Sequence, residues 1–144
     1  MATPVVYPQF KLKQNNGNAI DLDTDTIKVM IVTSAYTYSA AHDFINDANA
    51  DEVSGTNYTA GGTAISGVTL ALDGNNAEWI HDDIVWAQSG AGFANGRTFI
   101  WYLDTGNAAT SKVIQYMSEA SDFGNVAGPL TLDGSATTGV LNVT

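Results

Sequence analysis

The chain has 144 residues, with 15 acidic and 5 basic side chains, a net charge of −10 and no cysteine. This length suits one domain, and the lack of cysteine excludes a disulfide framework and thiolate metal ligands. Because binding to phosphate groups needs clustered Lys and Arg, the charge argues against nucleic acid and against an anionic membrane surface as partners.

The first predicted element is an extended N-terminal arm or edge strand over residues 1–13. The segment Val5–Lys13 is β-prone, and Pro4 and Pro8 lack the amide hydrogen that a central strand would donate. An isolated arm would fray, whereas an arm laid along the sheet edge of another chain gains backbone hydrogen bonds. The apolar side chains predicted to bind such a partner are Val5, Val6, Tyr7 and Phe10. The alternative is a first strand paired within its own domain, particularly over Gln9–Lys13.

Three aspartates, Asp21, Asp23 and Asp25, stand before the strongest predicted strand, Thr26–Ser34. Their spacing matches the first ligand positions of an EF-hand calcium loop, but Thr26 replaces the required glycine and the closing glutamate is missing. In an extended backbone the three carboxylates would share one face and would need another loop to hold Ca²⁺. The sequence therefore favours a solvated acidic lead-in to the strand, and leaves the triplet as a weak metal candidate.

The middle of the chain changes character after Thr26–Ser34. That strand is apolar on both faces, which is typical of a central strand. Residues 36–52 lose the period of two, so we predict a long loop with at most one short helix within Ala40–Asn46. The following segment, Val53–Ala60, is predicted as a weak edge strand.

The remaining apolar runs are short and separated by Gly, Asn and Asp, which indicates an all-β fold. They predict strands at Thr63–Asp73, with a bulge at Gly67, at Glu78–Ala87, with an interruption at His81-Asp82-Asp83, at Arg97–Leu103 and Lys112–Ser118, and at Leu130–Leu132 and Val140–Val143. The predicted fold is a single-domain antiparallel β-sandwich or barrel over residues 14–144. It has eight or nine strands, the N-terminal arm and at most one short helix.

No catalytic residue and no cofactor are predicted. His42 and His81 have no serine in a nucleophile elbow near them, because the chain lacks a G-x-S-x-G motif. Adjacent residues of a strand point to opposite faces, so the His81-Asp82-Asp83 run is better explained by a bulge or tight turn than by an acid–base cluster. The glycine-rich residues 90–96 lack the Lys-Ser/Thr of a P-loop and are predicted as a turn.

Aromatic side chains raise the question of carbohydrate binding, since exposed rings stack on sugars. Strand alternation instead places most of these rings, including Trp79, Trp86 and Trp101, in a sandwich core. The N-terminal residues lack the basic and apolar regions of a signal peptide, and no apolar run reaches the roughly 20 residues that span a bilayer. We therefore expect a soluble chain, and the lack of cysteine fits synthesis in a reducing cytoplasm.

Four segments resemble small structural proteins of tailed bacteriophages. They are DLDTDTIKVMIVTSAYT (residues 21–37), SGTNYTAGGTAISGVTL (54–70), DDIVWA (82–87) and the LDTG that follows the aromatic strand (103–106). The likeness covers about residues 20–118. These segments are turn and strand patterns, so they carry over no catalytic residue.

The resemblance implies a virion structural protein, and in particular a head decoration (cement) protein. Such a protein binds the outer capsid surface and stabilises contacts between capsomers. The implied partners are the major capsid protein or other virion proteins and further copies of the chain, as in a trimer. The implied location is the capsid exterior, after synthesis in the bacterial host cytoplasm. The alternatives are a tail or neck structural component and a glycan-binding β-sandwich module on the virion surface.

Overall fold

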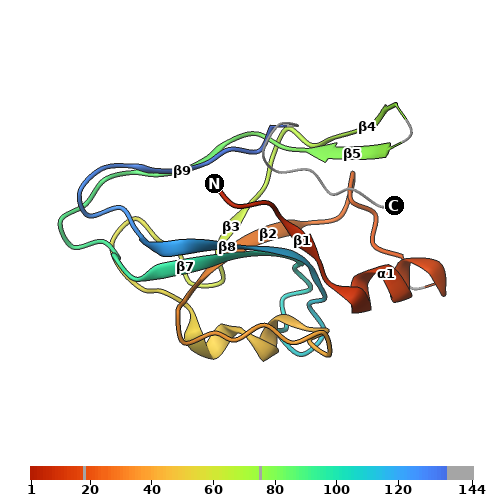
Figure 1. Ribbon diagram of the computed structural model, residues 1–144, viewed down its shortest axis with the longest axis horizontal. Helices are drawn as coiled ribbons and strands as arrows, with labels where there is room; N and C mark the ends of the chain where they lie inside the picture. The colour runs from red at the N-terminus through yellow and green to blue at the C-terminus, as the bar shows by residue number, and fades with distance from the viewer. Residues whose placement is uncertain (18, 75, 136–144) are drawn as a thin grey trace.

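The computed structural model describes residues 1–17, 19–74 and 76–135. Within these ranges the chain is an all-β domain with one short helix (Figure 1). The elements are β1 (Val5–Val6), α1 (Pro8–Asn15), β2 (Ile27–Thr33), β3 (Thr63–Ala64), β4 (Thr69–Asp73), β5 (Asn76–Ile80), β6 (Ile84–Trp86), β7 (Gly96–Leu103), β8 (Val113–Phe123) and β9 (Leu130–Leu132). Two short 3₁₀ turns, Ile45–Asp47 and Asn49–Asp51, precede β3.

The strands form one five-stranded antiparallel sheet in the order β1-β8-β7-β2-β3 and two two-stranded ribbons, β4-β5 and β6-β9. Figure 1 shows the ribbons above the sheet and the 3₁₀ turns below it, so the sheet is covered on both faces. No closed barrel forms among the described residues. The predicted all-β class is confirmed, and the architecture is an open, layered sandwich.

The centre of the sheet is β7, which pairs with β2 on one side and β8 on the other. Trp101 of β7 lies between Val29 and Gln115 on the face under the ribbons, and its neighbour Ile100 lies on the opposite face. All four side chains are buried, because both faces of the sheet pack against other layers. The prediction that the β2 segment is apolar on both faces is confirmed, but β2 lies between β7 and the two-residue β3 rather than at the centre.

The prediction of an extended arm over residues 1–13 is wrong, whereas the alternative, an edge strand paired within the domain, holds for Val5 and Val6 but not for Gln9–Lys13. Only Val5 and Val6 form a strand, which pairs with β8 of the same chain, and the chain then turns into the helix α1. Pro8 starts this helix, where the missing amide hydrogen has no cost, and Lys13 lies in the last turn, where a cation complements the helix dipole. The same proline that suggested an edge strand therefore begins a helix.

Other boundaries also differ from the prediction. The segment Val53–Ala60 forms no strand, and the turns after Phe44 are 3₁₀ rather than a helix within Ala40–Asn46. The run Thr63–Asp73 splits into β3 and β4 at Gly67, which has a φ of 60° and packs against the Asp82 carboxylate. The predicted interruption at His81-Asp82-Asp83 is confirmed as the break between β5 and β6. The predicted strand Val140–Val143 lies outside the described residues.

Candidate functional site

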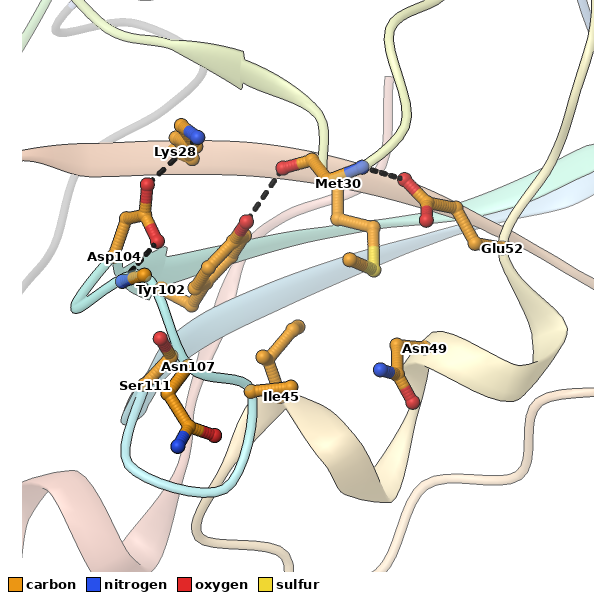
Figure 2. A pocket seen from close by; sticks show the side chains of 12 residues that line it. Lys28, Met30, Ile45, Asn49, Glu52, Tyr102, Asp104, Asn107 and Ser111 are labelled. Atoms are coloured by element: carbon orange, nitrogen blue, oxygen red, sulfur yellow. Dashed lines mark hydrogen bonds and ion pairs between the residues drawn. The ribbon is translucent and has the colours of Figure 1, made fainter.

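A pocket of about 340 Å³ opens on the lower side of the sheet, between β2, the end of β7 and two loops (Figure 2). Its apolar part is formed by Met30 of β2, Ile45 of the first 3₁₀ turn and Ala108 of the loop after β7. The polar groups around it come from β2, β7 and the loops, so distant parts of the sequence build one site. Its polar side chains are Lys28, Asn49, Glu52, Tyr102, Asp104, Asn107 and Ser111.

One end of the pocket holds an ion pair. The ammonium group of Lys28 lies 2.6 Å from Oδ2 of Asp104, and the amide of Gly106 donates to Oδ1 of Asp104 over 2.9 Å. The hydrogen bond from Lys28, followed by that from the Gly106 amide, holds the pKa of the Asp104 carboxyl below its usual range. The charge of Lys28 is therefore matched within the chain.

The other end holds Glu52, whose Oε1 accepts two hydrogen bonds of 2.7 Å, from the Tyr58 hydroxyl and the Gly61 amide. Tyr102 donates to the carbonyl of Gly61 from inside the pocket, as Figure 2 shows. Burial raises the pKa of Tyr102 to about 12, so this phenol stays a donor at neutral pH. These bonds fix the loop before β3 against the sheet.

The residue after Gly61 in this loop, Gly62, has to be a glycine. Gly62 has a φ of 79°, and a Cβ there would lie 2.0 Å from the carbonyl oxygen of Val29. Only a residue without a side chain allows the loop to approach β2 this closely. The sequence does not identify the pocket residues as one site, because they come from separate segments whose proximity depends on the fold. The one available signal was the Gly61-Gly62 pair in a polar stretch.

The structure places the four predicted partner-binding residues differently. Tyr7 and Phe10 are buried in the chain's own core, and the Tyr7 hydroxyl lies 2.7 Å from that of Tyr36. Val6 is half-buried, and Val5 is exposed. The prediction that this segment offers Tyr7 and Phe10 to another chain is therefore wrong, because these side chains hold the N-terminus to its own sheet.

The aspartate triplet lies in a turn, not in an extended segment. Oδ1 of Asp21 accepts hydrogen bonds from the amides of Asp23 (3.1 Å) and Thr24 (3.3 Å), and Oδ2 of Asp25 accepts one from the amide of Asp21 (2.9 Å). Hydrogen bonds from Thr24 and Asp23 lower the pKa of the Asp21 carboxyl. The described residues contain no group of three His, Asp or Glu side chains that could hold a metal ion.

Both histidines take part in hydrogen bonds that position neighbouring elements. His81 is buried, its Nε2 accepts a hydrogen bond of 3.1 Å from the Trp101 indole, and its Nδ1 lies 2.7 Å from the Asp82 carbonyl. Nδ1 is therefore the protonated nitrogen of a neutral ring, and burial lowers the pKa of His81. Nδ1 of His42 lies 3.0 Å from the Tyr36 hydroxyl, which continues to Tyr7.

The prediction of a tryptophan-rich core is confirmed, since Trp79, Trp86 and Trp101 are all buried. A sugar therefore cannot stack on these three rings. The most exposed of the described aromatic rings is Tyr38, which is 36% exposed and stacks on Tyr116 at a centroid distance of 4.5 Å.

The β4-β5 ribbon carries an apolar surface that the sequence analysis missed. Leu70 is 52% exposed and Leu72 is 84% exposed. In the ladder Leu70 lies opposite Trp79 and Leu72 lies opposite Ala77, so these side chains share one face of the ribbon. The Leu-x-Leu spacing before an Asp-Gly turn was visible in the sequence, but it does not tell which face is covered. We call Leu70 and Leu72 the hairpin leucines.

Comparison with protein-family models, curated proteins and solved structures finds no match. In the part of the chain that the structure describes, no helix has the length and apolar character to cross a membrane.

Proposed function

We propose that the chain is a structural protein of a tailed-bacteriophage virion. Its role is that of a capsid decoration protein, which binds the outer surface of the capsid and stabilises contacts between capsomers. The resemblance of residues 20–118 to small phage structural proteins gives the class, and the surface of the domain suggests how it would dock.

The single observation that carries the proposal is the pair of exposed hairpin leucines. Exposed single apolar residues are ordinary, but two exposed leucines on one face of a ribbon, with Leu72 next to its turn, are typical of a contact surface. Burying both side chains against a partner would remove apolar area from water and so stabilise the complex by about 25 cal/mol per Å². Among the described residues the β4-β5 ribbon pairs with no third strand, and a ribbon of this kind is suited to strand addition.

The proposal contains no catalytic role. His42 and His81 are both engaged in hydrogen bonds with side chains or backbone that position the fold, and the imidazole of His81 is buried. Both ring nitrogens of His81 are engaged in this way, which supports a structural role for that residue. The net charge of −10 supports a protein partner with a basic or neutral surface.

The experiment is to analyse purified virions of the phage that encodes the chain by mass spectrometry and particle imaging. We expect the chain in the virion and its density on the outer capsid surface. Density at the tail or neck would support the tail-component alternative. Absence of the chain from virions would overturn the proposal. A glycan-binding role would require sugar-dependent changes at Tyr38 and Tyr116, which a glycan array followed by NMR would detect.

A further inference from the structure

We propose that the pocket of Figure 2 binds a basic side chain, arginine or lysine, presented by a protein partner. The identity of that partner as a virion protein rests on the proposed function, but the chemistry of the site does not.

Charge is unbalanced in the pocket. The positive charge of Lys28 is matched by Asp104 at 2.6 Å, whereas Glu52 takes part in none of the ion pairs between described residues. One negative charge therefore remains for an occupant. An anion would meet Glu52 with no free cation beside it, while a cation would complete the pairing.

Glu52 is also held in place for a ligand. The hydroxyl of Tyr58 and the amide of Gly61 both donate to Oε1, and no described residue donates to Oε2. Figure 2 shows a dashed line to only one of the two carboxylate oxygens of Glu52. Because two hydrogen bonds already fix the carboxylate, a partner cation gains a charge-assisted bond without ordering the glutamate first.

The shape of the pocket fits the rest of a basic side chain. Met30, Ile45 and Ala108 provide apolar surface for a methylene stem, which Lys and Arg bury while their charged ends stay with polar groups. Asn49, which is exposed and lines the pocket, supplies an amide carbonyl for a further donor of a guanidinium or ammonium group, whereas Oδ1 of Asn107 already accepts a hydrogen bond of 3.0 Å from the Ala109 amide. The volume of about 340 Å³ leaves room for one such side chain and bridging water.

The test uses the full-length protein and two peptides, acetyl-Gly-Arg-Gly-amide and the same peptide with citrulline. Citrulline has nearly the shape of arginine but no charge. Binding is followed by NMR chemical shifts at low ionic strength, where charge pairing is least screened. We expect the arginine peptide to shift the signals of Glu52, Asn49 and Asn107, and to bind about tenfold more tightly than citrulline, a factor that corresponds to about 1.4 kcal/mol.

Two variants complete the test. Glu52→Gln keeps an oxygen for Tyr58 and Gly61 and removes the charge, so it should reduce the affinity for arginine to that for citrulline. Asp23→Asn removes the same charge from an exposed turn and should leave the affinity unchanged. Equal binding of the two peptides, or equal loss in both variants, would overturn the proposal and indicate a neutral ligand or general charge attraction. Since no virion is needed, a failure of the proposed function would not affect this result.

Discussion

Strand β7 and the β4-β5 ribbon differ in how the two faces of their strands are buried. In β7 both sets of side chains are covered, so Trp101 and Ile100 are buried on opposite faces. In the ribbon one face is covered only at its base, where Trp79 is buried and donates to the carbonyl of Leu22, while Leu72 at the other end is 84% exposed (Figure 1).

This difference separates stability from recognition. Folding free energy comes mainly from apolar area that the fold itself removes from water, and β7 contributes buried side chains on both of its faces. Leu70 and Leu72 of the ribbon are exposed among the described residues, so they remain available for the proposed contact with a partner. Substitutions in β7 should therefore change the free energy of unfolding, whereas substitutions of the hairpin leucines should change partner binding.

The largest effect is expected at the centre of the sheet. Trp101→Ala should reduce the free energy of unfolding by about 3–5 kcal/mol, the usual range for emptying a buried large aromatic site. It also leaves Nε2 of His81 without its indole donor. Urea denaturation would measure the change. A loss below about 1 kcal/mol would show that the sheet is not the stabilising region.

A second comparison tests whether the N-terminus belongs to the core. Tyr7→Ala should cost about 3 kcal/mol, because Tyr7 is buried against β8 and its hydroxyl contacts that of Tyr36. The matched control, Val5→Ala, changes an exposed side chain of the same segment and should stay within about 0.5 kcal/mol. Equal and small losses of stability in both variants would show that the N-terminal segment is only loosely attached to the domain.

Buried His81 should make the free energy of unfolding depend on pH. Burial lowers the pKa of His81 below its unfolded value of 6.5, so the unfolded chain binds more protons below that pH. The contribution of neutral His81 to the free energy of unfolding should therefore be fully present above about pH 6.5 and should be lost as the pH falls from there to the lower pKa of the folded state. Denaturation curves between pH 7.5 and 5 would measure the loss.

The control for this prediction is the other histidine. His42→Asn should keep the pH dependence, whereas His81→Gln should remove it, whatever its effect on absolute stability. An NMR titration of the wild-type protein gives an independent check, with the His81 ring remaining neutral at pH values where a free histidine is protonated. A His81 pKa at or above 6.5 would contradict the account.

The smallest effect on stability is expected in the ribbon. The double variant Leu70→Ala/Leu72→Ala should change the free energy of unfolding by no more than about 0.5 kcal/mol per substitution, because both side chains are exposed. The matched buried leucine, Leu132→Ala, should cost about 2–5 kcal/mol. A large loss in the double variant would mean that the hairpin leucines stabilise the fold itself.

The parts of the fold that the sequence predicted are those fixed by local patterns. The segments of β2, β7 and β9 were predicted nearly to their ends, because their apolar runs are bounded by turn residues. The segment of β8 was predicted only over its first, buried half, since its outer half is mostly exposed and polar. Alternation therefore predicts a strand best where layers cover it.

The errors arise where one residue type permits two structures. Pro8 is acceptable in an edge strand and at the first position of a helix, and the core contact of Phe10 decided for the helix. The pocket could not be predicted, because Glu52 and Tyr102 meet only through the pairing of β7 with β2 and the turn at Gly62. The exposure of Leu72 likewise depends on where the neighbouring layer ends.

The most direct test of the account is docking by the hairpin leucines. Virions of the phage that is proposed to encode the chain, prepared without the chain, would be mixed with purified wild-type protein, with Leu70→Ala/Leu72→Ala, and with Leu12→Ala, which removes an exposed leucine from α1. Cosedimentation would measure affinity. We predict binding of the wild type and of Leu12→Ala, and at least about tenfold weaker binding of the double variant, because fully burying one leucine side chain contributes about 1.5–3 kcal/mol and a tenfold change needs about 1.4 kcal/mol. Binding of the double variant at wild-type affinity would contradict the assignment of the ribbon as the docking surface.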